Sequence, residues 1–273
     1  MAEAEAQSGA TRGASRGAVR LLSDGAVATL LLDQPAKRNA MTRAMWRALP
    51  ALLADAAADD GVAVLRVEGT GGHFCGGADI GEFAATYATP DTTAEASAEI
   101  ATAVEALARF PKPALAVIRG ACVGGGVALA LACDLRLAAE DARFAVTPAK
   151  LSLIYSQADT TRLIRAIGAA RAKDLLFTAR LVDAAEALRI GLVEEVATPD
   201  ALDALVAARI APVAAGSRSA LAAIKAMMAA IERGAPQDDP ALRDLFNDAF
   251  ASEDFREGYR AFLEKRPPVF TAC

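Results

Sequence analysis

Two glycine-dense segments constrain the fold of this chain more than any other sequence feature. They cover residues 69–77 and 120–126. Each follows a short apolar run, 62–67 or 114–118, and each leads toward a helical pattern. Short apolar runs bounded by glycine are typical of buried strands, and strands that alternate with helices form parallel sheets. The pattern therefore predicts an α/β fold.

The other elements follow from apolar periodicity and from turn residues. Asp24-Gly25 between two β-rich runs, 18–23 and 26–32, predicts a hairpin. Thr42 is expected to cap a helix that ends near Asp59 and is kinked by Pro50. We further expect helices from Thr92 or Thr93 to Phe110 and over 127–132, 201–209, 217–232, 240–251 and 254–264, a helical stretch over 159–188 broken at Gly168, and short strands over 135–138 and 193–196. The chain thus divides into a tail (1–17), an α/β core (18–199) and a helical region (200–273).

Charge and cysteine content exclude several classes of protein. The chain has 29 Lys and Arg against 34 Asp and Glu, and this net charge of -5 argues against nucleic-acid binding. One histidine leaves little room for a zinc site, and no metal is expected. The four cysteines lack C-x-x-C spacing and are expected to be reduced: Cys75, Cys122, Cys133 and Cys273. The N-terminus lacks the apolar region of a secretory signal, and no apolar run is long enough to span a membrane, which predicts a soluble cytoplasmic protein.

The glycine segments also indicate a kind of chemistry. Glycine lets a backbone turn sharply and present free N–H groups. Two such loops that face each other could direct two N–H donors at one oxygen, which would form an oxyanion hole. Neither segment has the Lys-Ser/Thr of a P-loop or the spacing of a dinucleotide fingerprint. The alternative is that each segment is only a tight turn.

Several blocks in order make the chain resemble the enoyl-CoA hydratase/isomerase (crotonase) family from about residue 18 to residue 270. The blocks include HFCGGADI at 73–80 and IRGACVGGG at 118–126, and further matches lie at 32–41, 111–144, 161–196 and 252–270. The resemblance implies a spiral core of β-β-α turns and a C-terminal helical region that mediates trimerisation. It also implies a homotrimer or a dimer of trimers, and an acyl-CoA substrate with no separate cofactor, since CoA enters as part of the substrate.

The same resemblance assigns roles to particular residues. The family stabilises a thioester enolate with two backbone N–H groups, which fall on Ala78 and Gly125. Its CoA contacts fall on Lys37, Arg38, Ala40, Ala78, Ile80, Phe262 and Lys265. Lys265 would contact a CoA phosphate, from a neighbouring subunit. Without the resemblance, Phe262 would be read as a helix core residue and Lys265 as a solvated charge.

The hydratase pattern is broken at two positions. Hydratases of the family use two glutamates to activate water and to protonate the α-carbon. The first belongs three residues after the middle glycine of the second loop, where this chain has Ala128. The second belongs four residues after Phe144, where this chain has Pro148. Alanine and proline cannot transfer protons, so ordinary hydration is not supported.

The segment from Thr147 to Tyr155 instead resembles the T-P-x-x-L-x-x-x-Y segment of the methylmalonyl-CoA decarboxylase branch. That branch usually has His at the position of Ala78. The Tyr155 hydroxyl could orient a substrate carboxylate or a proton, or Tyr155 could simply be a packed aromatic residue. Asp159 is a second, speculative acid or base. We interpret His73 as structural and Asp79 as a helix cap.

These observations favour an acyl-CoA enzyme of the enoyl-CoA hydratase/isomerase family that acts through an enolate. Because both glutamates are missing, decarboxylation is the leading specific reaction. One alternative is a non-catalytic acyl-CoA-binding protein that kept the fold. RNA binding is another, but the chain has no basic signal to support it.

Overall fold

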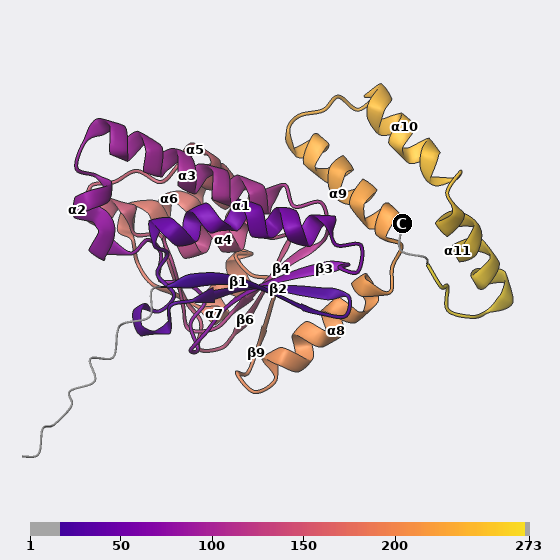
Figure 1. Ribbon diagram of the computed structural model, residues 1–273, viewed down its shortest axis with the longest axis horizontal. Coiled ribbons are helices and arrows are strands. Elements are labelled where there is room, and N and C mark those ends of the chain that lie inside the picture. The colour runs from indigo at the N-terminus through magenta and orange to yellow at the C-terminus, as the bar shows by residue number, and fades with distance from the viewer. Residues whose placement is uncertain (1–16, 271–273) are drawn as a thin grey trace, which may run out of the picture.

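The computed structural model describes residues 17–270, so residues 1–16 of the expected tail lie outside the described residues. Its main sheet has six strands (Figure 1). In spatial order they are β1 (Ala18–Asp24), β2 (Val27–Asp33), β3 (Val64–Gly69), β4 (Ala114–Ile118), β6 (Leu135–Ala139) and β9 (Glu195–Ala197). β1 and β2 form the expected antiparallel hairpin, and the pairs from β2 to β9 are parallel. The predicted α/β class is confirmed.

A second, smaller sheet was not predicted from the sequence. It contains β5 (Ala121–Val123), β7 (Arg143–Ala145) and β8 (Val182–Asp183). After each of β4 and β6, the chain adds one short strand to this sheet and then enters a helix. β3 is followed in the same way by Cys75, which pairs with Cys122 of β5. Three successive β-β-α turns therefore form a spiral.

Helices surround the main sheet. α1 (Arg43–Ala58) packs against α3 (Pro90–Ala108), and both lie on the same side of the sheet (Figure 1). α8 (Leu202–Ala214) contacts β3, β6 and β9 on the other side. The remaining helices are α2 (Phe83–Thr86), α4 (Gly125–Ala132), α5 (Gln157–Ile167), α6 (Ala169–Thr178), α7 (Ala184–Ile190), α9 (Arg218–Glu232), α10 (Pro240–Ala249) and α11 (Glu253–Glu264).

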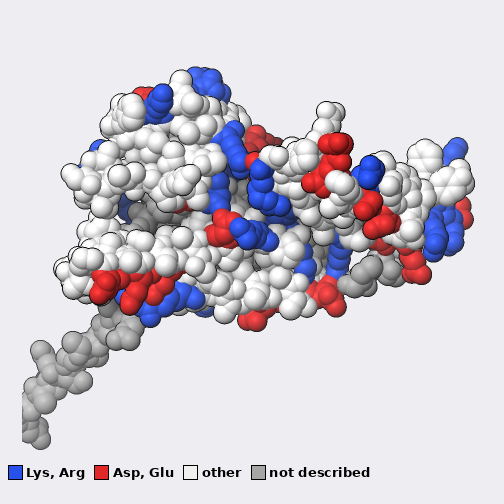
Figure 2. Space-filling view, turned by 90° about the horizontal axis from the view of Figure 1, so that it is seen from above, with Lys and Arg blue, Asp and Glu red and all other residues white. Residues whose placement is uncertain are grey.

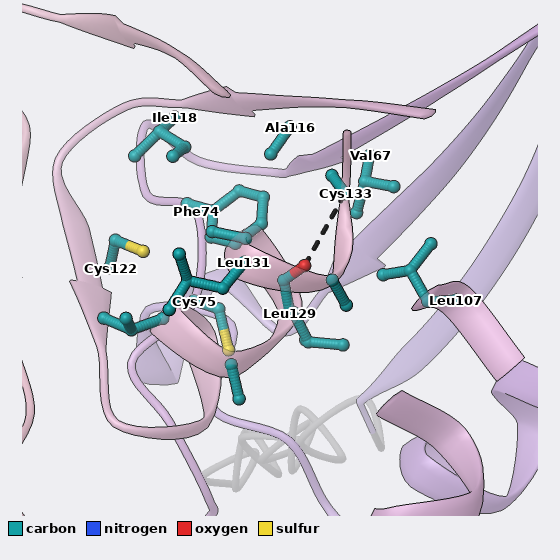
Figure 3. Packing of buried hydrophobic residues seen from close by; sticks show 14 of the residues in the cluster. Val67, Phe74, Cys75, Leu107, Ala116, Ile118, Cys122, Leu129, Leu131 and Cys133 are labelled. Carbon is teal, nitrogen blue, oxygen red and sulfur yellow. Dashed lines mark hydrogen bonds between the residues drawn. The ribbon is translucent and has the colours of Figure 1, made fainter. Parts of the chain in front are cut away.

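Alternating strand residues build a core on each face of the main sheet. Along β4, Ala114, Ala116 and Ile118 join the core under α1, α3 and α4. Leu115 and Val117 point the other way and pack with the buried face of α8. The period of two that separates these sets is the ordinary alternation of a strand. Figure 3 shows the larger core, in which Cys75, Cys122 and Cys133 are buried; Cys273 lies outside the described residues.

Several helices differ from the sequence prediction in their bounds or interruptions, and α8 for example continues to Ala214 rather than ending at 209. α1 continues through Pro50, and its buried face of Met45, Leu49 and Leu53 packs into the core. α3 begins at Pro90 because Thr89 caps it, earlier than the expected Thr92 or Thr93. The stretch over 159–188 breaks at Gly168 as predicted, and β8 interrupts it a second time. Proline is common at the first position of a helix, so Thr89-Pro90 was an available start signal, whereas a two-residue strand leaves almost none.

The last three helices stand apart from the sheet (Figure 1). α9 is tied to the core by Lys225, whose ammonium group donates to Asp134 at 2.7 Å and to the Lys112 carbonyl at 2.9 Å. On the face shown in Figure 2, charged side chains form small groups of both signs, separated by wide uncharged areas. No helix within residues 17–270 has the length and apolar character needed to cross a membrane.

Candidate active site

The two glycine segments lie side by side and are joined through their backbones. The Cys75 N–H donates to the Ala121 carbonyl at 2.9 Å, and the Val123 N–H donates to the Cys75 carbonyl at 2.9 Å. Cys75 and Cys122 therefore pair as in a parallel sheet. This pairing fixes the register of one loop against the other.

Close approach of the loops requires glycine at two positions. A Cβ atom on Gly126 would lie 2.4 Å from the Cys75 carbonyl oxygen. Gly77 has a φ of +97°, and a Cβ there would lie 2.9 Å from the Val123 carbonyl oxygen. Any larger residue would push the loops apart.

The pairing brings Ala78 close to Gly125. The Cα of Gly77, the neighbour of Ala78, lies 3.7 Å from the position that a Cβ on Gly125 would take. Met41 pairs with this loop, donating to Gly77 O at 2.7 Å and accepting from Asp79 N at 2.9 Å, which leaves the Ala78 N–H between them unused. Within residues 17–270, neither the Ala78 N–H nor the Gly125 N–H donates a hydrogen bond.

The segment 37–40 runs along the first loop. The Gly76 N–H donates to the Arg38 carbonyl at 2.7 Å. Asn39, which is fully buried, donates from its amide to the Thr70 carbonyl at 2.8 Å and to the His73 carbonyl at 2.7 Å. Asn39 thereby fixes the segment to the loop. Sequence reasoning did not single out Asn39, although an Asn in the left-handed region, with a φ of +57°, is a known turn signal.

The structure brings together most of the residues expected to contact CoA. Lys37, Arg38 and Ala40 lie on the segment beside Ala78, and Ile80 follows on a short 3-10 helix, Ile80–Glu82, with 64% of its surface exposed. A cluster of cations and exposed apolar surface at one loop is compatible with a ligand that carries phosphates and a ring.

Asp79 caps that 3-10 helix, as the sequence suggested, by accepting from the Gly81 N–H at 3.0 Å. It also pairs with the Lys37 ammonium at 2.6 Å. Burial opposes ionisation of Asp79, but the hydrogen bonds from Lys37 and Gly81 outweigh it and hold the pKa below its usual value. Asp79 is therefore ionised at neutral pH, and its carboxylate is bound by the Lys37 ammonium and the Gly81 N–H.

His73 also has a structural contact. Its Nδ1 accepts a hydrogen bond from the Ala121 N–H at 3.1 Å. The imidazole thus joins the end of β3's loop to the start of β5, in line with the structural interpretation. Among residues 17–270, no group of three or more His, Cys, Asp or Glu side chains is arranged to hold a metal ion.

Tyr155 reaches the second glycine loop. Its hydroxyl donates to the Gly124 carbonyl at 3.2 Å, next to Gly125. Burial raises the pKa of the hydroxyl well above its usual value, and the negative charge of Asp159 raises it further. Tyr155 therefore keeps its proton at neutral pH and acts as a donor beside the loop.

Asp159 is buried at the start of α5 and has partners for both carboxylate oxygens. Oδ2 accepts from the Ser156 hydroxyl at 2.6 Å, and Oδ1 accepts from Arg162 at 3.2 Å. Its own N–H donates back to the Ser156 hydroxyl at 3.1 Å. These contacts are those of a capped helix terminus that carries an ion pair.

The two positions that carry glutamate in hydratases hold apolar side chains. Ala128 is buried in α4, one turn after Gly125. Pro148 opens the 3-10 helix Pro148–Leu151 and is half-buried.

Phe262 and Lys265 do not join the site within one chain. Phe262 lies on α11 with 81% of its surface exposed, and Lys265 ends that helix. Figure 1 shows α11 and α2 at opposite ends of the molecule. Since α2 follows directly after Ala78 and Ile80, α11 cannot reach the loops of its own chain.

A narrow pocket with a cavity volume of about 20 Å³ adjoins Ala78. Its walls are mainly apolar and come from α1, α2 and α3, including Trp46, Phe83, Tyr87 and Ile100. Sequence reasoning missed this pocket and Trp46 in particular. The one signal available was the presence of a single tryptophan in a chain with 5% aromatic residues.

Comparison with known proteins agrees with this geometry. Residues 23–272 match the enoyl-CoA hydratase/isomerase family. A Bacillus subtilis protein named probable enoyl-CoA hydratase is 34% identical over 258 residues, which cover 93% of this chain and 98% of that protein. The solved structure of an enoyl-CoA hydratase/isomerase family protein from Hyphomonas neptunium is 42% identical, with a TM-score of 0.91 over 93% of this chain and 98% of that one.

A second solved structure, an enoyl-CoA hydratase/carnithine racemase from Magnetospirillum magneticum, is 35% identical, with a TM-score of 0.90. The match covers 93% of this chain and 96% of the Magnetospirillum magneticum chain. Sequence and structure thus match the same group of proteins along nearly the whole chain. The chain belongs to the enoyl-CoA hydratase/isomerase family.

Proposed function

We propose that this enzyme acts on an acyl-CoA thioester through an enolate, and that its reaction is decarboxylation rather than hydration. The observation that carries the proposal is the pair of adjacent, unused N–H donors at Ala78 and Gly125, combined with apolar side chains at Ala128 and Pro148. The donors suit a developing oxyanion, whereas the apolar side chains cannot supply the two proton transfers of hydration.

The thioester carbonyl oxygen would accept hydrogen bonds from the Ala78 and Gly125 N–H groups. Gly125 begins α4, so the positive end of that helix dipole adds to the stabilisation of negative charge. When the carboxylate on the α-carbon leaves as CO₂, the electron pair of the broken C–C bond becomes the enolate. A proton then adds to the α-carbon, and no carboxylate base is needed for the bond cleavage.

Tyr155 is the side chain that we propose to orient the leaving carboxylate or to deliver the proton. Support comes from its hydroxyl, which is held protonated at the Gly124 carbonyl. Asp159 is the weaker candidate for an acid or base, because both of its oxygens already accept hydrogen bonds. We assign Asp159 to the support of α5 and, through its charge, of Tyr155.

The test is to incubate the protein with crotonyl-CoA, malonyl-CoA and methylmalonyl-CoA and to analyse the products by mass spectrometry. We expect loss of CO₂ from one of the two dicarboxylic thioesters and no addition of water to crotonyl-CoA. Hydration of crotonyl-CoA at an ordinary enzymatic rate would overturn the proposal.

Tyr155→Phe and Asp159→Asn form a matched pair for the role of the side chains. Tyr155→Phe should lower kcat about 100-fold, as expected for loss of a proton donor, with little change in KM. Asp159→Asn should lower thermal stability and leave kcat at neutral pH nearly unchanged. The reverse pattern would assign the proton transfer to Asp159.

A non-catalytic acyl-CoA-binding protein is the second candidate function, and the two apolar replacements at Ala128 and Pro148 favour it. Such a protein would bind all three thioesters with similar affinity and convert none of them. Measuring the affinity for each thioester by calorimetry, together with the product analysis, separates this case from an enzyme whose true substrate is not among the three thioesters.

A further inference from the structure

Trp46 carries a buried hydrogen-bond donor that the fold does not use. It is the single tryptophan of the chain, it lies on α1, and 2% of its surface is exposed. Its Nε1 has no acceptor among residues 17–270. Leaving a buried donor unpaired costs about 1–3 kcal/mol, and a leucine or phenylalanine would avoid that cost. We therefore expect the indole N–H to donate to an acceptor from outside the chain.

The benzene part of the indole ring, next to this N–H, packs against Gly125. Cζ2 and Cη2 of Trp46 lie 3.1 Å and 3.4 Å from the position that a Cβ on Gly125 would take. Cζ2 is bonded to the ring carbon that bears Nε1, so the N–H belongs to the same edge. Trp46 and Ala78 also line the same pocket. The indole ring thus lies against Gly125 and shares a pocket with Ala78, the two residues proposed to bind the thioester carbonyl.

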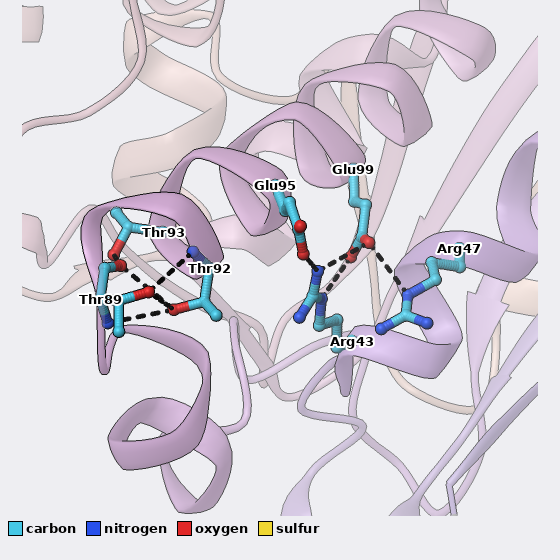
Figure 4. A network of polar contacts seen from close by, with 7 residues as sticks. All are labelled: Arg43, Arg47, Thr89, Thr92, Thr93, Glu95 and Glu99. Carbon is cyan, nitrogen blue, oxygen red and sulfur yellow. Dashed lines mark hydrogen bonds and ion pairs between the residues drawn. The ribbon is translucent and has the colours of Figure 1, made fainter.

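The charged groups of the pocket wall already have partners. The Arg43 guanidinium is bound by Glu99 at 2.6 Å and by Glu95 at 3.0 Å (Figure 4). Glu82 accepts from the Arg43 N–H at 2.6 Å, and Asp79 is paired with Lys37. Besides the Ala78 N–H and the hydroxyls of Thr86 and Tyr87, a ligand in the pocket would therefore find the Trp46 N–H as a buried donor without an acceptor among residues 17–270.

We propose that Trp46 determines specificity by donating its N–H to an oxygen on the acyl group, at the carbon next to the thioester or at the one beyond. The substrate class is then an acyl-CoA with an oxygen acceptor at one of these carbons, such as a carbonyl, a hydroxyl or a carboxylate. This inference rests on the proposed function, because it uses the same placement of the thioester. For the indole N–H to reach that oxygen, the acyl group must widen the narrow pocket that Trp46 and Ala78 line.

Acetoacetyl-CoA and butyryl-CoA test the inference, since they have the same carbon chain and differ in the oxygen at the third carbon. Neither has a free carboxylate, so neither is a substrate of the proposed decarboxylation. We expect calorimetry to show about tenfold tighter binding of acetoacetyl-CoA, equal to about 1.4 kcal/mol. In Trp46→Phe this preference should disappear while butyryl-CoA binds as before. Phe83→Leu, which alters another ring of the pocket, should leave the preference intact.

Nuclear magnetic resonance gives a readout that does not depend on affinity. With one tryptophan, the ¹⁵N-labelled protein has a single indole N–H signal, and acetoacetyl-CoA should shift its proton downfield whereas butyryl-CoA should not. An unshifted signal, or a Trp46→Phe variant that weakens both ligands equally, would overturn the inference and leave Trp46 a packing residue. Failure of the proposed function would appear separately, as intact selectivity without loss of CO₂ from either dicarboxylic thioester.

Discussion

Gly126 lies at the closest approach of the two loops, and a methyl group there has no room. Its Cβ would meet backbone atoms, the Cys75 carbonyl oxygen at 2.4 Å and carbonyl carbon at 3.1 Å, as well as the Cys75 Cβ at 2.9 Å. Backbone that is fixed by hydrogen bonds on both sides cannot move aside as a flexible side chain can.

We therefore expect Gly126→Ala to destabilise the protein by about 1–3 kcal/mol, the usual cost of overpacking a core. Gly258→Ala is the matched control, because its Cβ on α11 would make ordinary contacts at 3.7 Å and alanine favours a helix. Urea unfolding should give a lower free energy of unfolding for Gly126→Ala and a higher one for Gly258→Ala than for the wild type. Equal midpoints for Gly126→Ala and the wild type would mean that the loops separate easily.

At the level of residues, sequence alone predicts what depends on local chemistry. The glycines predict that the two loops approach each other closely, and the resemblance assigns Ala78 and Gly125 to the oxyanion hole. Asn39 and Trp46 could not be predicted, because their importance comes from groups 31–34 residues away for Asn39 and from Gly125 for Trp46. Such long-range contacts have no pattern in a single sequence.

Among the elements, α3 forms one wall of the pocket and depends on its cap. Thr89 accepts from the Thr92 N–H at 3.2 Å, and the Thr92 hydroxyl accepts from the Thr89 N–H at 3.1 Å (Figure 4). This reciprocal arrangement satisfies backbone donors at the first turn. The same helix carries Ala96 and Ile100 into the pocket.

Thr89→Ala should cost about 1 kcal/mol of stability, the typical loss of an N-cap. Because fraying at this end loosens the pocket wall, KM for the acyl-CoA substrate should also rise. Thr93→Ala removes a hydroxyl that only bonds back to the Thr89 carbonyl at 2.8 Å, and it should have a much smaller effect. Urea unfolding of the two variants measures the loss of stability, and steady-state kinetics measures the change in KM. Equal losses would show that the cap does not control the pocket.

Elements were predictable in proportion to their length. Apart from the three-residue β9, the strands of the main sheet and the long helices have enough residues for periodicity to show. β5, β7 and β8 have three residues or fewer, and they exist because the neighbouring turns of the spiral offer backbone partners. Their position depends on contacts between segments that are far apart in the sequence, so the second sheet could not be predicted.

Over the whole molecule, three buried thiols couple stability to alkaline pH. Burial raises the pKa of Cys75 and of Cys133 to about 12, and it raises the pKa of Cys122 well above its usual value. In the unfolded chain these thiols ionise near pH 9. Above that pH the unfolded state binds fewer protons than the folded state, so the free energy of unfolding falls as pH rises.

Each thiol lowers the free energy of unfolding by about 1.4 kcal/mol per pH unit between roughly pH 9 and pH 12. Below pH 9 the contribution is constant. Urea unfolding at pH 8, 9, 10 and 11 measures the slope, and Cys122→Ala should reduce it by about 1.4 kcal/mol per unit. A slope that Cys122→Ala leaves unchanged would mean that this thiol is accessible to solvent in the folded state.

An exposed row of aromatic side chains lies on the C-terminal helices. Phe246 and Phe250 of α10 and Phe255 and Tyr259 of α11 form a row of rings with centroids 5.2, 5.3 and 6.4 Å apart, and more than 40% of each residue is exposed. Exposed aromatic clusters of this kind mark interfaces. We propose that further copies of the chain cover them in a homotrimer or a dimer of trimers.

Light scattering should give a mass of three or six times 28.1 kDa. Phe250→Asp should shift the protein to monomer, whereas Asp248→Asn on the same helix should not. Since α11 lies at the opposite end of the chain from α2 (Figure 1), which forms part of the pocket wall, we expect Phe262 and Lys265 to contact CoA only in a neighbouring subunit. The monomeric variant should therefore bind acyl-CoA as weakly as Lys265→Ala does. Full affinity in a monomer would show that α11 takes no part in CoA binding.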